Sequence, residues 1–260
     1  MTIRDKAITG TPCWIELDSS DVAKSREFYG QLFGWTAQEP NEEFGVYFNY
    51  SLGDALIAGG MKAPEGMPDV WSIYLATDDI KRTLDDARAH GGQVIVEAMP
   101  VGDLGVMGFL IDPTGASIGV WQPGEHQGFG KIGEHGAPGW FELHTREYEK
   151  ALDFYRAVFG WKTQTEADTE EFRYTTLVVG EEQHAGVMDA SAFLPEGVPA
   201  HWSVYFAVDD TDAALAKIDE LGGSTVMPAE DTPYGRLAVA ADSGGVQFKL
   251  VGPNEQMPTK

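Results

Sequence analysis

Cysteine is almost absent from this sequence, which has a single one, Cys13, among 260 residues. One cysteine excludes an internal disulfide and any zinc or iron–sulfur site that needs several thiolates. Basic residues are also scarce, because 18 lysines and arginines stand against 41 aspartates and glutamates, for a formal net charge of −23. A field of this sign repels phosphate backbones and anionic lipids, so we expect neither nucleic acid nor a membrane as a partner.

Long hydrophobic runs are missing as well. No stretch approaches the roughly 18 uninterrupted apolar residues of a membrane span. The opening residues, MTIRDKAITG, lack the basic and then apolar pattern of a signal peptide, and we therefore expect a cytoplasmic protein. The chain is 43% hydrophobic and 11% aromatic, which is enough apolar material for packed cores and excludes a disordered chain.

The chain is a tandem duplication. Residues 10–35 align without a gap with residues 136–161, and eleven of these 26 positions are identical. A second block, PEGMPDVWSIYLATDD at 64–79, matches PEGVPAHWSVYFAVDD at 195–210. Internal repeats of this kind determine the domain organisation. We predict a first domain over 1–123, a linker over 124–135 and a second domain over 136–260.

Each half is itself doubled, more faintly. In the first unit, an alternating strand over 13–18 precedes a helix capped by Asp21, and two further strands are joined by the hairpin signal Gly53-Asp54. A second unit repeats this order with a strand over 71–77, a helix over 80–90 and three more strands. The expected fold class is therefore α+β. Four βαβββ units, two per half, form a curled mixed sheet around a cleft in each half, with helices on one sheet face.

Side-chain alternation on the first strand of each half predicts a binding face. Ile15 and Leu17 face the helix, which leaves Trp14, Glu16 and Asp18 on the opposite face. Aromatic walls with a few polar groups suit a small molecule, although tryptophans at strand starts are also common in hydrophobic cores. The candidate ligand-binding residues across both halves are Trp14, Glu16, Asp18, Trp71, Trp140, Trp202 and Arg236.

Several motifs resemble the glyoxalase/bleomycin-resistance, or vicinal oxygen chelate, superfamily. They are the W-x6-D spacing, the F-Y-x3-F-G-W helix end, the strand–D-D–helix block and the D-P-T-G turn. The resemblance covers residues 10–123 and 136–253, and within the family it is to two-domain bacterial members labelled glyoxalase-like or hydroxylase. It implies the fold predicted above. The family includes glyoxalase I, extradiol dioxygenases and metal-free drug-binding proteins, so fold alone does not select one activity.

The resemblance also implies where family enzymes hold a divalent metal. The corresponding residues here carry no suitable ligand, since tryptophan and glycine have no lone pair to donate and lysine brings a positive charge. We therefore predict no metal and no other cofactor, with a divalent metal displaced to Glu142 and His144 as the alternative. The positions concerned are Trp14, Trp71, Trp140 and Trp202 on first strands, and Gly119 and Lys249 on final strands.

Glu142 and His144 are the candidate catalytic residues. They share the cleft face of one strand, and these residue types are the usual proton carriers near neutral pH. If Arg236 and Lys249 both face the cleft, the second half offers a pocket that favours anions. His126 in the linker is expected to be a solvated surface residue, and His201 is expected to face away from the cleft because its strand parity is opposite to that of Trp202.

Three functions remain open at the level of sequence. The first is a metal-free protein that binds a small aromatic or oxygenated metabolite or drug in an aromatic-lined cleft. The second is a lyase, isomerase, hydroxylase or cyclase that acts on a small oxygenated metabolite. The third is a protein-interaction module whose aromatic residues are core. A monomer and a homodimer are both compatible with a fused pair of halves.

Overall fold

The structure is a computed structural model that describes residues 2–3, 6–40 and 46–255. The first half contains β2 (Pro12–Ser19), α1 (Val22–Phe33), β3 (Thr36–Ala37), β4 (Phe48–Leu52), β5 (Ala55–Lys62), β6 (Val70–Ala76), α2 (Ile80–Ala89), β7 (Gln93–Val101), β8 (Gly105–Ile111) and β9 (Ser117–Pro123). The second half contains β11 (Pro138–Thr145), α3 (Tyr148–Phe159), β12 (Thr163–Asp168), β13 (Arg173–Val179), β14 (Glu182–Asp189), β15 (His201–Ala207), α4 (Thr211–Glu220), β16 (Ser224–Thr232), β17 (Gly235–Ala241) and β18 (Gln247–Gly252). A short ladder pairs β1 (Thr2–Ile3) with β10 (Lys131–Ile132).

The two halves build equivalent eight-stranded sheets. Their strand orders are β3-β4-β5-β2-β6-β9-β8-β7 and β12-β13-β14-β11-β15-β18-β17-β16. In each sheet the first strands of the two units pair antiparallel at the centre, while each of them pairs parallel with the last strand of its own unit. The predicted α+β fold of four βαβββ units in curled mixed sheets is therefore confirmed.

Local sequence explains where the helices begin and end. Asp21, Asp79 and Asp210 accept hydrogen bonds from the backbone N–H groups of the first turns of α1, α2 and α4. Gly34 and Gly160 end α1 and α3 in the left-handed conformation, with φ of 71° and 68°. Among the described helices, none is long and apolar enough to cross a membrane.

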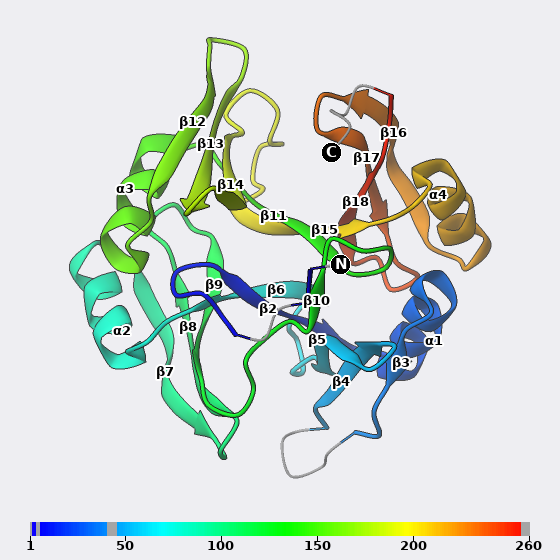
Figure 1. Cartoon of the computed structure of the whole chain (residues 1–260), viewed down its shortest axis with the longest axis horizontal. Helices are drawn as coiled ribbons and strands as arrows, with labels where there is room; N and C mark the ends of the chain where they lie inside the picture. The colour runs from blue at the N-terminus through cyan, green and yellow to red at the C-terminus, as the bar shows by residue number, and fades with distance from the viewer. Residues whose placement is uncertain (1, 4–5, 41–45, 256–260) are drawn as a thin grey trace.

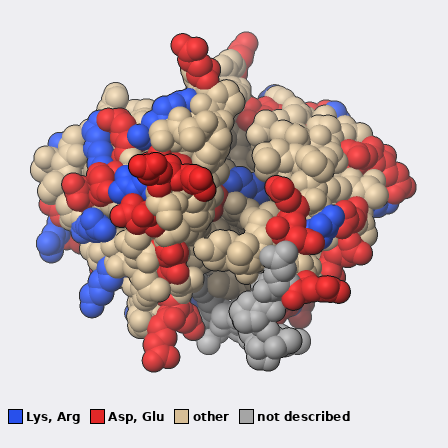
Figure 2. Space-filling view, turned by 90° about the horizontal axis from the view of Figure 1, so that it is seen from above, with Lys and Arg blue, Asp and Glu red and all other residues tan. Residues whose placement is uncertain are grey.

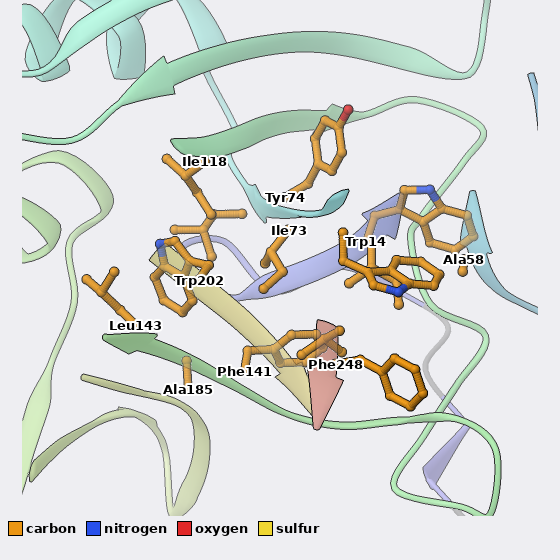
Figure 3. Packing of buried hydrophobic residues seen from close by; sticks show 14 of the residues in the cluster. Trp14, Ala58, Ile73, Tyr74, Ile118, Phe141, Leu143, Ala185, Trp202 and Phe248 are labelled. Atoms are coloured by element: carbon orange, nitrogen blue, oxygen red, sulfur yellow. The ribbon is translucent and has the colours of Figure 1, made fainter. Parts of the chain in front are cut away.

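The sheets lie back to back, with their concave faces turned to opposite sides (Figure 1). The helices lie on the convex side, where α1 packs beside α4 and α2 beside α3, while β6 contacts β15 across the middle. One continuous hydrophobic core fills this space. Figure 3 shows Trp202 of the second half close to Ile118 and Ile73 of the first.

Candidate functional site

Strand register determines which side chains share the concave faces. In the first half, Trp14 pairs with Tyr74 and Glu16 with Ser72, whereas Leu17 pairs with Trp71. Directly paired residues of antiparallel strands point to the same face. The concave face of the first half therefore carries Trp14 and Glu16, as predicted. The equivalent face of the second half carries Trp140, Glu142, His144, Tyr205 and His201.

Trp71 and Trp202 lie on the convex face, so their predicted place in the cleft is wrong. Their indole N–H groups donate to the hydroxyls of Tyr29 and Tyr155 inside the shared core. The error comes from the paired aspartates before α2 and α4, because the second of each pair caps the helix. Counting seven residues back from that cap reaches the serines that face the clefts, Ser72 and Ser203.

Two further expectations about the second half are corrected. Arg236 faces α4 and not the cleft, and its guanidinium pairs with Asp212 at 2.6 Å and with Asp231 at 3.1 Å. Lys249 alone of the two predicted cations reaches the concave face. His201 also lies on that face, because it pairs with His144 across the sheet, and the two imidazole rings stack at 5.3 Å.

A buried polar network lies at the floor of the second-half cleft. Glu142 accepts hydrogen bonds from the hydroxyls of Tyr174 at 2.9 Å and Tyr205 at 2.8 Å. Lys249 Nζ lies 2.9 Å from the Glu142 carboxylate and 3.0 Å from the Tyr205 hydroxyl. His144 Nε2 lies 2.7 Å from the same carboxylate oxygen and also contacts Lys249 Nζ. Four polar side chains from four strands thus converge on one carboxylate.

The charges of this network hold Glu142 ionised. Burial alone would raise the pKa of Glu142, but the Lys249 ammonium and the hydrogen bond from His144 together lower it well below its usual range. Burial and the Glu142 charge raise the pKa of the Tyr174 and Tyr205 hydroxyls, which therefore stay neutral donors. The cleft floor has an ion pair of one carboxylate and one ammonium.

Aromatic side chains form the walls above this floor. Tyr174 stacks on Phe172, with ring centroids 5.7 Å apart, and lies 6.4 Å from the exposed Tyr234. The exposed Phe193 meets the edge of the His144 ring. Figure 2 shows this face hollowed, with basic side-chain atoms deep inside the hollow. A separate surface depression of about 610 Å³ near α2 and α3 contains none of these residues.

The first half repeats the same arrangement around Glu16. The Trp14 indole donates to the Tyr47 hydroxyl at 3.0 Å, just as the Trp140 indole donates to Tyr174 at 2.8 Å. Tyr74 donates to Glu16 at 3.1 Å, as Tyr205 donates to Glu142. Glycine is required beside Tyr47 and Tyr174. A Cβ on Gly59 or on Gly186 would lie about 2 Å from the hydroxyl oxygen of Tyr47 or Tyr174, respectively.

The sequence interpretation missed these four tyrosines, although the repeat held the signal. Tyr47 and Tyr174 occupy equivalent positions in the two halves, and so do Tyr74 and Tyr205 within W-S-x-Y. A polar aromatic residue kept in both halves at the same position of a half-buried strand needs a partner for its hydroxyl. For Tyr74 and Tyr205 that partner is the glutamate of the neighbouring strand, and Tyr174 reaches Glu142 across β14.

The first-half face differs in charge and is covered. Gly119 stands where the second half has Lys249, and burial together with the charge of Asp18 raises the pKa of Glu16 to about 7. His126 of the linker lies over Trp14, with ring centroids 4.4 Å apart. The expectation that His126 is a solvated residue is therefore wrong, and burial lowers its pKa to about 4. Trp14 is 4% exposed, whereas Trp140 is only half-buried.

The donor set of either face does not fit a divalent cation. Across the described residues, no group of three or more histidine, cysteine, aspartate or glutamate side chains is placed to hold a metal. The Glu142 carboxylate, which would have to coordinate the metal, is already paired with the Lys249 ammonium. The predicted placement of Glu142 and His144 on one face is confirmed, but their catalytic role stays a prediction.

Comparison with known proteins identifies relatives of the whole chain. The family model described as Glyoxalase/Bleomycin resistance protein/Dioxygenase superfamily matches residues 14–120 and 137–250. The glyoxylase-like protein CFP32 of Mycobacterium tuberculosis is 38% identical over 263 residues, which cover 98% of this chain and 100% of the relative. The anthracycline biosynthesis protein DnrV of Streptomyces peucetius is 36% identical over 267 residues and covers 96% of this chain and 95% of its own length.

Solved structures share the fold at low sequence identity. The 2,3-dioxygenase LapB from Pseudomonas sp. KL28 superposes with a TM-score of 0.66 at 14% identity, covering 98% of both chains. The Mn(II)-bound glyoxalase from Novosphingobium aromaticivorans gives a TM-score of 0.64 at 14% identity, covering 96% of this chain and 84% of the other. At this identity the likeness concerns the fold, and function must be argued from the site.

Proposed function

The chain belongs to the glyoxalase/bleomycin resistance protein/dioxygenase superfamily, and from this membership we propose that its second half binds a flat, oxygenated small molecule without a metal. The ligand lies in the hollow above β11 and β15. Its apolar rings contact Trp140 and the aromatic walls, and its oxygen approaches Lys249. The first-half face, covered by the linker, does not take this ligand.

The observation that carries the proposal is the combination of floor and walls. Glu142 and Lys249 form a buried ion pair with two tyrosine hydroxyls attached. Two exposed aromatic side chains flank this network, Tyr234 beside Tyr174 and Phe193 beside His144. Small-molecule sites are typically apolar hollows with a few placed polar groups. The name of the relative DnrV, an anthracycline biosynthesis protein, supports a polycyclic aromatic ligand.

The test is binding of 2-hydroxyanthraquinone, a flat tricyclic ligand with one acidic hydroxyl, measured by equilibrium dialysis. We expect saturable binding of one molecule per chain. Trp140→Leu and Tyr234→Ala should each weaken it about tenfold, because an aromatic stacking contact contributes about 0.5–1.5 kcal/mol beyond the area it buries. Met99→Ala, which removes an exposed apolar side chain of the first half, is the matched control and should leave the affinity unchanged. Absence of binding by the native chain overturns the proposal.

One observation favours a second candidate, an acid–base enzyme acting in the same hollow. The Glu142 carboxylate lies 2.7 Å from His144 Nε2, a geometry in which a proton can pass to or from a bound molecule. This function predicts that an enolisable aromatic ketone such as 2-tetralone incorporates deuterium from heavy water faster with the protein than without it. Mass spectrometry measures the incorporation, and Glu142→Gln should abolish it. If the ketone exchanges no faster with protein, the hollow only binds.

A further inference from the structure

His144 Nε2 has two neighbours that make opposite demands on it. One is the Glu142 carboxylate at 2.7 Å, which needs a proton on Nε2 to form a hydrogen bond. The other is Lys249 Nζ, which as an ammonium needs a lone pair on the same atom. A neutral imidazole nitrogen carries either the proton or the lone pair, and never both. The geometry therefore fixes how many protons the three groups share.

Two arrangements account for the contacts, and both leave the group neutral overall. Either Lys249 is an ammonium that donates to both the Glu142 carboxylate and a bare His144 Nε2, or Lys249 is an amine and a cationic His144 shares its Nε2 proton between the amine and the carboxylate. In each case one positive charge balances the Glu142 carboxylate. Adding one more proton makes both nitrogens cationic, and the group then carries a net positive charge. Only a nearby anion makes that state favourable in a buried site.

Among the residues that the structure describes, the side chains around the pair supply no such anion. Tyr174 on β13 and Tyr205 on β15 are neutral hydroxyls with raised pKa values. His201 on β15 faces the pair as well, and burial lowers its pKa, so it is neutral near pH 7. Within the described chain, Lys249 pairs with one carboxylate, that of Glu142. The place for a second negative charge lies on the open side of the hollow.

We infer that the second-half site binds acidic phenols or enols as their anions, with the Lys249–His144 pair taking up the ligand's hydroxyl proton. The inference rests on the proposed binding function and names its ligand class. The step is balanced: the ligand O–H bond breaks, the proton moves to the nitrogen pair, and the resulting oxygen anion lies beside two cationic nitrogens. No electron is transferred and no metal takes part.

The first half provides an internal contrast. It keeps the tryptophan, the glutamate and both tyrosines, but has Gly119 in place of Lys249 and Asp18 in place of His144. Neither nitrogen of the proton-accepting pair is present there. An anionic ligand would meet Glu16 and Asp18 instead, which repel it. Lys249 and His144, the two residues that differ from the first half, are therefore the reason that we expect an anionic ligand in the second half only.

The test uses 2-hydroxyanthraquinone, whose neutral and anionic forms absorb at different wavelengths. Titrated with the native chain, the bound dye should show the anion spectrum at least one pH unit below the point where the free dye ionises, a tenfold shift in its ionisation equilibrium. Lys249→Met should bind the dye in its neutral form. Because this variant leaves Glu142 unpaired, the double variant Glu142→Gln/Lys249→Met, which keeps shape and removes both charges, is measured alongside. Arg236→Gln, which removes a cation from the opposite face of the sheet, is the control, and the bound dye should still ionise at the lowered pH in this variant.

The outcomes separate the two proposals. Dialysis reports binding independently of colour, so a native chain that binds the dye with its neutral spectrum overturns the inference and leaves the binding function standing. An anion spectrum that persists in both Lys249 variants also overturns it. A native chain that binds no dye overturns the proposed function itself. Binding of 2-methoxyanthraquinone, which has no proton to give, should be at least tenfold weaker than that of the hydroxyl compound.

Discussion

Glu16 and Glu142 show how one neighbouring residue changes the chemistry of a buried carboxyl group. Both are buried on equivalent strands and accept a hydrogen bond from a tyrosine. The pKa of Glu16 is raised to about 7 because burial opposes its charge and Asp18 adds repulsion. The pKa of Glu142 is lowered because Lys249 and His144 outweigh its burial. Two replacements, Lys249 for glycine and His144 for aspartate, therefore separate the two states.

Lys249→Gly should therefore convert Glu142 into a group like Glu16. Without the ammonium, burial dominates, and we expect the pKa of Glu142 to rise toward neutrality. Isotope-edited infrared spectroscopy of the carboxyl band, compared with and without Glu142→Gln, measures the change. Arg236→Gly, which removes a cation from the other face, is the control. A carboxyl band of Glu142 that stays ionised at pH 5 in the Lys249 variant contradicts this account.

Glu16 should also make stability depend on pH. Its folded pKa of about 7 lies above the ordinary glutamate value of 4.5, so between these values the folded chain binds a proton that the unfolded chain has lost. Stability from this group is present below about pH 4.5 and is lost as the pH rises through 7, by up to about 3 kcal/mol. Glu16→Gln removes this slope. Urea unfolding at pH 5 and pH 8 should show a smaller loss of stability across that interval in the variant than in the native chain. Equal losses in the two would contradict the prediction.

At the scale of elements, the sequence predicted strands and helices well, because their signals are local. The helix predicted over 80–90 is α2 (Ile80–Ala89), and the strand predicted over 71–77 is β6 (Val70–Ala76). The face of β6 could not be assigned in this way. The seven-residue spacing from Trp71 ends at Asp78, whereas the same spacing from the helix cap Asp79 reaches Ser72. A shift of one residue inverts the face of every side chain of the strand, and Trp71 was misplaced for this reason. The surroundings of His126 were mispredicted for another reason, since its contact with Trp14 joins residues distant in sequence.

The linker should behave as a fixed cover of the first-half face. The His126 ring packs against Trp14 and Trp121, and its carbonyl accepts a hydrogen bond from the Trp121 indole. His126→Ala removes the ring contacts and should cost about 1–2 kcal/mol, in line with two aromatic pairs. Tryptophan fluorescence should become more accessible to acrylamide. His90→Ala, at an exposed helix end, is the control, and equal quenching in both variants would show that the linker does not shield this face.

At the scale of the whole molecule, the two halves are locked together by reciprocal contacts. Tyr29 of the first half donates to Asp242 of the second at 3.0 Å, and Tyr155 of the second half donates to Asp112 of the first at 2.9 Å. The indoles of Trp35 and Trp161 donate to backbone carbonyls across the same boundary. The duplication was readable from the sequence. These cross-contacts were not, because each residue looks like an ordinary core aromatic until both sheets are in place.

The reciprocal lock predicts that the halves unfold together. Tyr29→Phe leaves the Trp71 N–H without its acceptor and removes one donor from the buried Asp242, so we expect a loss of about 2–3 kcal/mol. Tyr155→Phe, its counterpart, should cost a similar amount for the same reasons. Calorimetry should give a single transition in the native chain and in both variants, shifted to lower temperature. Two separate transitions, with one half unaffected by either substitution, would mean that each half folds on its own, and the shared core would then not couple them.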